Sequence, residues 1–151
     1  MKNFLVFLPI SIILLLTSCA GQNWKSISSD MVWQKDNKIS FSIELGNEGK
    51  RNIDLLIRHN VHYAFENIPV HIKIKGPSVD YAKTLDIPIK DDSGLFKGEA
   101  LGDIIDISYR LPLSISKMGK YTLEFSNGAT EALFDVMEVG YKLESDEVSA
   151  D

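Results

Sequence analysis

The chain has 151 residues, 16 Lys and Arg against 21 Asp and Glu, and a formal net charge of −5. This length suits one domain with a sizeable core. The acidic balance argues against nucleic acid as a partner, because phosphates require a basic surface, and the single cysteine excludes an internal disulfide and a Cys-rich zinc site.

The first eighteen residues predict a secretory signal peptide. Lys2 precedes an almost wholly apolar run from Phe4 to Leu16, and small residues follow the run. The run is too short to cross a ~30 Å hydrocarbon core comfortably, since that takes about 20 residues. We therefore expect residues 1–18 to be removed from the mature protein.

The segment Leu16-Thr17-Ser18-Cys19 fits the lipobox of bacterial lipoproteins. In that motif the cysteine thiol receives a diacylglyceryl group, the peptidase cleaves before the cysteine, here between Ser18 and Cys19, and the new amino group is acylated. Two or three acyl chains hold a protein stably, because each buried CH₂ contributes about 0.8 kcal/mol. The sequence thus predicts a protein held on a bilayer by lipid on Cys19, with no other cofactor. The alternative is an ordinary secreted protein whose lone cysteine lies near the cleavage site by coincidence.

Residues 19–30 are expected to be the lipidated cysteine and a short polar tether, and residues 31–143 a β-domain. If the first core strand begins near Met31, the tether reaches roughly 40 Å at most. No acidic cluster closely follows the cysteine, and some outer-membrane lipoproteins use such a cluster for surface export, so we expect the periplasmic face of the outer membrane. Residues 144–151 are acidic without apolar anchors, which predicts a disordered tail.

From Lys38 onward, apolar and polar residues alternate with a period of two, as in half-buried antiparallel strands. Such runs cover residues 39–45, 53–57, 68–74, 85–89, 107–113, 121–125 and 136–143. Turn-forming residues separate them, so we predict an all-β fold: a two-sheet antiparallel sandwich, either immunoglobulin- or fibronectin-like or jelly-roll-like. Prolines at 69, 88 and 112 predict edge strands or bulges, and residues 94–106 a long loop or a poorly formed strand.

Three segments resemble metal or phosphate sites but fit other structures better. His59 and His62 lie three apart, so on a strand their side chains point to opposite faces, and we expect solvent-facing histidines. The run 91–94 (Asp-Asp-Ser-Gly) lacks the EF-hand spacing and predicts a turn between strands. The glycines at 98 and 102 have no following Lys-Ser/Thr, which indicates a loop with positive φ angles.

Enzymatic activity is not predicted. The sequence has no G-x-S-x-G elbow, its only thiol is expected to carry lipid, and nothing raises the pKa of carboxylate pairs such as Asp103 and Asp106. A competing hypothesis is sugar binding by aromatic side chains, which requires two or three of them on one exposed face. The candidates are Trp24, Trp33, Tyr63, Tyr81 and Phe96, and in a small sandwich most such residues fill the core.

Four segments in order behind the lipobox resemble the gliding-motility lipoprotein family GldH over nearly the whole mature chain. The segments are Trp33 with Phe41-Ser42-Ile43; Leu56-Ile57-Arg58 with Tyr63 and Asn67 before Ile68-Pro69-Val70-His71-Ile72; Gly98-Glu99-Ala100-Leu101-Gly102-Asp103-Ile104; and Gly119-Lys120-Tyr121-Thr122 with the run 136–143. The third segment is the most specific. The chain departs from the pattern at Phe96, where Trp is expected, and in the short stretch 126–131.

The resemblance implies a non-enzymatic, membrane-anchored accessory of the gliding machinery, which is linked to type IX secretion, acting through contacts with other envelope proteins. The surface to test first comprises Arg58, Tyr63, Asn67, Gly98, Leu101, Gly102 and Asp103. Arg58 should face outward from a strand whose inward residues are Ile53, Leu55 and Ile57, either for a partner or as a solvated or internally paired arginine. A carbohydrate-binding or a general envelope-assembly lipoprotein are the alternatives.

Overall fold

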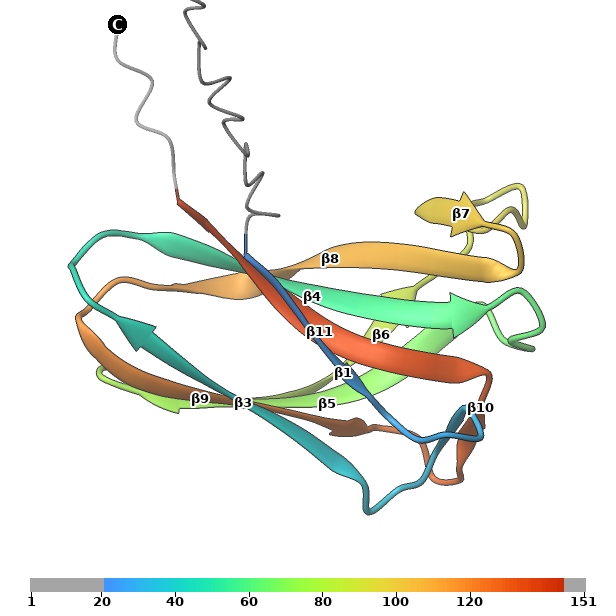
Figure 1. Cartoon of the computed structure of the whole chain (residues 1–151), viewed down its shortest axis with the longest axis horizontal. Coiled ribbons are helices and arrows are strands. Elements are labelled where there is room, and N and C mark those ends of the chain that lie inside the picture. The colour runs from blue at the N-terminus through green and yellow to red at the C-terminus, as the bar shows by residue number, and fades with distance from the viewer. Residues whose placement is uncertain (1–20, 146–151) are drawn as a thin grey trace, which may run out of the picture.

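The computed structural model describes residues 21–145, in which two antiparallel sheets face each other (Figure 1). One sheet has the order β1 (Gln22–Ser26), β11 (Val136–Ser145), β4 (Arg51–Asn60), β8 (Ile104–Ile115) and β7 (Glu99–Leu101). The other has the order β3 (Lys38–Leu45), β9 (Gly119–Asn127), β5 (Asn67–Gly76) and β6 (Val79–Pro88). The short strands β2 (Val32–Trp33) and β10 (Leu133–Phe134) pair with each other. The expected all-β sandwich is confirmed. The signal peptide, Cys19 and most of the acidic tail lie outside the described residues.

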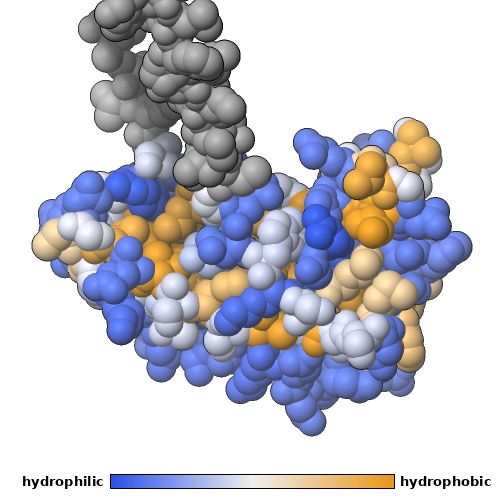
Figure 2. Space-filling model, in the orientation of Figure 1, coloured by the Kyte–Doolittle hydropathy of each residue, from blue (hydrophilic) through white to orange (hydrophobic). Residues whose placement is uncertain are grey.

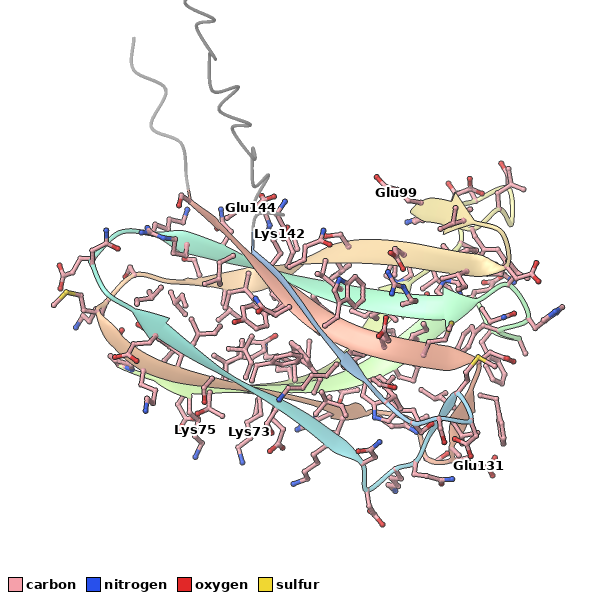
Figure 3. The ribbon with its side chains drawn as sticks, viewed as in Figure 1. Lys73, Lys75, Glu99, Glu131, Lys142 and Glu144 are labelled. Carbon is pink, nitrogen blue, oxygen red and sulfur yellow. The ribbon has the colours of Figure 1, made fainter. Side chains whose placement is uncertain are left out.

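The core lies between the sheets and follows from the alternation in the sequence. In β3 every second residue is buried, and in β5 the side chains of Ile68, Val70, Ile72 and Ile74 are wholly buried. Because the side-chain period of a strand is two, the same alternation leaves polar side chains on the two outer faces. Figure 3 illustrates this with Lys73 and Lys75 of β5, which point away from the sandwich.

The expected start of the domain at Met31 is wrong. Residues 22–26 form β1, which pairs with β11 along its whole length, and the amide of Ile27 donates to the carbonyl of Met137 at 3.0 Å. The segment shows no alternation of buried residues because β1 is an edge strand, and its residues are mostly exposed. At the other end, β11 runs to Ser145, two residues beyond the expected boundary.

The three prolines occupy different positions. Pro88 is the last residue of the edge strand β6, and Pro112 lies where the β4–β8 register shifts, so an edge and a bulge are confirmed there. Pro69 lies in β5, which is paired on both sides and is not an edge strand. It is tolerated because the β5–β9 pairing begins only at Val70, while the carbonyl of Pro69 accepts a bond from the amide of Gly128 at 3.0 Å.

The connections between the strands lie at the two ends of the sandwich, and those at one end are tighter than most of those at the other. At the loop end lie the connections 27–31, 34–37, 61–66, 89–98, 102–103, 128–132 and 135. At the turn end lie the three tight connections 46–50, 77–78 and 116–118. The chain enters nearer the turn end than the loop end (Figure 1). Gln22 pairs with Lys142, and Ser145, three residues further along β11, pairs with the first residue of β4.

Candidate functional site

The outer face of the five-stranded sheet carries a charged ladder centred on Arg58. The Arg58 Nε and Nη2 atoms donate to the two carboxylate oxygens of Asp106 at 2.7 and 2.8 Å, and its Nη1 atom donates to Glu138 at 2.5 Å. The three residues face one another on β8, β4 and β11. Hydrogen bonding to Asp106 raises the pKa of Arg58 further, so the guanidinium is permanently charged. The outward direction expected for Arg58 is confirmed, and the side chain is paired within the chain.

Trp24 covers the ladder on one side. Its ring lies 4.9 Å from the Arg58 guanidinium carbon, a cation–π distance. The next cross-strand row, Trp24–Gly140–Leu56–Ser108, has small side chains at two of its positions. A groove of about 480 Å³ lies over this part of the sheet and extends from Gln22 to Gly98 and to Glu99 at the start of β7.

A second charged cluster lies on the same face, nearer the turn end. Arg110 pairs with Asp54 and Glu144, and Lys142 donates to Glu144 at 2.9 Å. Figure 3 shows Lys142 and Glu144 together on β11, close to where β1 begins. The bond to Glu144 raises the pKa of Lys142 and lowers that of Glu144, so both remain charged over the neutral range.

The loop end carries most of the large apolar side chains that are exposed in the described part of the chain. Among the described residues, the exposed large apolar side chains are Phe65, Leu95, Leu101, Met118 and Phe134. Four of these lie at the loop end, and Leu101 is 83% exposed. In Figure 2 apolar surface is visible over β7 and the loop that precedes it. The phenyl ring of Phe65 stands edge-on to Tyr63 at 5.8 Å, so it is held in place although it is exposed.

Backbone hydrogen bonds join the connections of the loop end to one another. The amide of Val61 donates to the carbonyl of Asp103 at 2.9 Å, and the amide of Asn60 donates to the carbonyl of Asp135 at 2.9 Å. The amide of Ile89 donates to the carbonyl of Glu66 at 3.0 Å. The exposed apolar side chains therefore lie on loops and short strands whose neighbouring connections are joined by backbone hydrogen bonds.

Five residues of the predicted interaction surface are exposed and lie at the loop end: Asn67, Gly98, Leu101, Gly102 and Asp103. Of the other two, Arg58 is half-buried and Tyr63 is buried. Tyr63 was wrongly placed on the surface, since its side chain is 3% exposed and its hydroxyl donates to the carbonyl of Asn67 at 2.8 Å. Burial raises the pKa of Tyr63 to about 12. The ring fills the space under the β4–β5 connection, which no strand periodicity could indicate.

The backbone conformation of the segment 98–104 explains why positions 98 and 102 are glycines. Gly98 has a φ of 98°, and a Cβ atom there would lie 2.1 Å from the carbonyl oxygen of Asp106. Gly102 has a φ of 60° in the turn between β7 and β8. The expected positive φ angles are confirmed. They let β7 fold back onto β8, with which it pairs at Glu99↔Asp106 through Leu101↔Ile104.

The predictions for the two histidines and for the acidic run 91–94 have different outcomes. His59 is wholly buried, against the expectation of a solvent-facing side chain, because it occupies the inward position after Ile57. His62 is exposed. No group of three or more metal-ligating side chains occurs within residues 21–145. The run 91–94 forms the predicted turn, in which Asp91 Oδ1 accepts bonds from the amides of Ser93 at 2.8 Å and Leu95 at 3.0 Å.

The aromatic residues of the sugar-binding hypothesis do not share one exposed face. Trp33 and Tyr63 are buried, while Tyr81 and Phe96 pack against the core. Trp24 alone lies on the outer face of the five-stranded sheet, beneath Arg58.

Sequence patterns did not predict the contact of Arg58 with the Trp24 ring or the exposure of Phe65, Leu95 and Phe134. A bulky apolar residue inside a turn segment, as at Leu95 directly after the Asp-Asp-Ser-Gly run, was the available signal. Within the described part of the chain, no helix has the length and apolar character needed to cross a bilayer.

Among solved structures, the chain resembles carbohydrate-binding modules of family 35. The module from Clostridium thermocellum is 10% identical, with a TM-score of 0.42 over 80% of this chain and 98% of that one. A module from an environmental isolate is 12% identical, with a TM-score of 0.41 over 80% and 73% of the two chains. The module of Abf62 from Cellvibrio japonicus is 16% identical, with a TM-score of 0.39 over 80% and 75%. These are likenesses of overall fold alone.

A search of curated proteins gives no match. Residues 22–143 match the GldH lipoprotein family, a stretch that begins with β1 and ends two residues before the end of β11. The match covers all eleven strands of the sandwich and confirms the resemblance drawn from the four segments. The chain therefore belongs to the GldH lipoprotein family, whose members are gliding-motility lipoproteins, and this implies anchoring to a membrane by lipid.

Proposed function

We propose that this protein is a non-enzymatic accessory of the gliding machinery linked to type IX secretion, which acts by binding other envelope proteins through its loop end. In this proposal acyl chains on Cys19 hold the mature chain on the periplasmic face of the outer membrane. The main support for binding through the loop end is its exposed apolar side chains.

The position of this surface supports it. Phe65 and Leu95 lie on loops, and Leu101 and Phe134 lie on the short strands β7 and β10, all at the end opposite the tight turns. The chain enters from Cys19 nearer the tight turns. Lipid attached near one end leaves the other end open to proteins of the periplasm. Exposed apolar side chains on supported loops are a common feature of protein interfaces.

The charge of the loop end indicates the partner's chemistry. Its connections hold eight carboxylates, namely Asp30, Asp36, Glu66, Asp91, Asp92, Asp103, Glu131 and Asp135, and three lysines, namely Lys35, Lys90 and Lys97. Electrostatic complementarity therefore favours a partner surface that is basic and contains an apolar pocket.

The test is co-purification from crosslinked native envelopes. Wild-type protein should recover subunits of the gliding or type IX secretion machinery, and Leu101→Asp should recover several-fold less, because a charge in an apolar contact costs about 2 kcal/mol or more. Met118→Asp is the matched control, since it places the same charge on an exposed apolar residue at the turn end.

Three results would contradict parts of this proposal. Equal recovery with Leu101→Asp would remove the loop end as the docking surface. Recovery of glycan alone would favour the carbohydrate-binding alternative. Unchanged membrane fractionation of Cys19→Ala would refute the lipid anchor.

A further inference from the structure

The turn end of the sandwich exposes one methionine and carries a slight excess of lysines. Met118 is 53% exposed at the tip of the β8–β9 turn, and it is the one large apolar side chain of the described residues that is exposed outside the loop end. Lys117 beside it is exposed. The three turn-end connections contain two lysines, Lys50 and Lys117, against one carboxylate, Glu48. This balance is opposite in sign to that of the loop end.

The turns of this end are fixed to one another. The amide of Gly49 donates to the carbonyl of Ser116 at 3.0 Å. The buried Tyr121 hydroxyl donates to the carbonyl of Lys117 at 2.7 Å and lies 3.3 Å from the carbonyl of Pro77. Met118 therefore lies on a turn whose backbone is held in place by hydrogen bonds.

The length of chain between Cys19 and the first strand brings this end close to the lipid. Three residue steps separate Cys19 from Gln22, a reach of roughly 10 Å when extended. Lys142 is the partner of Gln22, and three residue steps along β11 lead from Lys142 to Ser145. The two stretches of chain are therefore equally long. Ser145 faces Arg51, and Arg51 faces Ile115, the last residue before the β8–β9 turn. An acyl anchor on Cys19 can therefore lie level with the turn end, while it cannot reach the loop end.

We propose that the turn end rests on the lipid bilayer, with Met118 in the headgroup layer and Lys117 beside lipid phosphates. The proposal rests on the lipid anchor of the proposed function. A single methionine and a lysine bind a membrane weakly by themselves. In a tethered protein this contact is intramolecular, so a weak interaction is sufficient to orient the domain. The acidic loop end then points away from the phosphates and towards the protein partner.

The test uses the full-length lipidated protein in vesicles of phosphatidylethanolamine and phosphatidylglycerol. Because the thiol of Cys19 carries lipid, a cysteine introduced by Met118→Cys or Leu101→Cys can be labelled alone with an environment-sensitive fluorophore. We expect headgroup-spin-labelled lipid to quench the fluorophore at position 118 and to leave the one at position 101 almost unaffected. Equal quenching at the two positions, or stronger quenching at 101, would overturn the orientation.

Since a fluorophore adds apolar surface of its own, unlabelled protein provides a second measurement. Amide hydrogen exchange in residues 116–119 should slow when wild-type protein is bound to the vesicles, and this protection should be lost in Met118→Asp. Exchange in residues 95–101 should be the same with and without vesicles. Protection of 116–119 in detergent at high protein concentration would point instead to a second copy of the chain or another protein as the occupant.

Flotation of the vesicles separates the two proposals. Protein that floats but shows no difference between positions 118 and 101 contradicts the turn-end contact and leaves the anchor and loop-end docking intact. Protein that does not float contradicts the anchor, and with it this contact.

Discussion

His59 lies at the end of β4 beneath the connection from β6 to β7. Its ring centroid is 5.3 Å from that of Phe96 and 6.0 Å from that of Tyr63. The Nδ1 atom lies 3.0 Å from the carbonyl of Asn60, and the buried Nε2 atom has no hydrogen-bond partner among residues 21–145. Burial lowers the pKa of His59 more than the bond to Asn60 and the charge of Asp106 raise it, and Lys90 lowers it further. The folded protein therefore favours the neutral ring.

This environment predicts that acid weakens the fold. In the unfolded chain His59 has a pKa near 6.5, so the unfolded state binds a proton more readily. The contribution of neutral His59 to the free energy of unfolding should be fully present above about pH 6.5. Below that pH the free energy of unfolding should fall, with a slope of at most about 1.4 kcal/mol per pH unit from this group. Urea unfolding of a soluble form without Cys19, between pH 5 and 8, measures this.

Two variants assign the pH effect to His59. His59→Phe should flatten this part of the pH profile, because Phe has no proton to bind. His62→Gln is the matched control, since His62 is exposed on the neighbouring connection and its loss should leave the slope unchanged. An unchanged slope in His59→Phe would show that another group is responsible.

At the scale of the elements, the open sides of the sandwich are protected by lysines that point inward. Lys25 of β1 reaches across to the carbonyl of Ser40 on β3, with its ammonium 4.9 Å from the ring of Phe41. Lys83 occupies an inward position of the edge strand β6, and its ammonium lies 5.9 Å from the ring of Tyr81. Inward charges on edge strands hinder pairing with a second chain, which suits a protein concentrated on a membrane.

The first strand is the element that sequence patterns do not reveal. Alternation is visible in β3, β5 and β9 because one face of each strand is buried, whereas β1 is exposed at four of its five positions. Its backbone approaches β11 closely at Gly140, where a Cβ atom would lie 2.1 Å from the carbonyl oxygen of Asn23. The pairing of β1 depends on a strand more than a hundred residues away, which local sequence does not specify.

A soluble form that starts at Met31 should therefore be less stable than one that starts at Gly21. It loses a five-residue strand, the cover of Trp24 over Arg58 and the buried side chain of Ile27, and we expect a loss of about 3 kcal/mol. The exposed edge of β11 should also promote association. Urea unfolding and light scattering of the two forms measure these effects. Equal unfolding midpoints would mean that β1 adds nothing to the fold.

At the scale of the whole molecule, charge and apolar surface are distributed unevenly. The acidic loop end and the slightly basic turn end lie at opposite ends of the strands, and the chain enters near the second. Figure 3 shows Glu99 on β7 far from Lys142 and Glu144 on β11. Such a distribution suits a protein that contacts lipid at one end and a basic protein at the other.

If the partner surface is basic, its capture should depend on salt. Screening shortens the reach of charges from about 10 Å at 0.1 M salt to about 3 Å at 1 M, so recovery from envelopes should fall as salt rises. The double variant Asp91→Asn with Asp92→Asn should bind more weakly at low salt and show a smaller salt effect. Glu48→Gln, at the turn end, is the control that should behave as wild type. Recovery that is insensitive to salt would mean that apolar contact alone holds the partner.

Sequence patterns predict the class of fold, most strands, the positive φ angles at Gly98 and Gly102 and the family, because period-two alternation, turn glycines and ordered motifs are local. They also predict exposure at Leu101 and Asp103 and an outward Arg58. The packing of the sheets and connections is needed to explain why Asp106 and Glu138 hold Arg58 and why Tyr63 and His59 are buried. The same packing brings exposed apolar side chains together at one end. These features depend on which strands become neighbours and which connections cover them, and contacts between segments far apart in the chain leave no periodicity in the sequence.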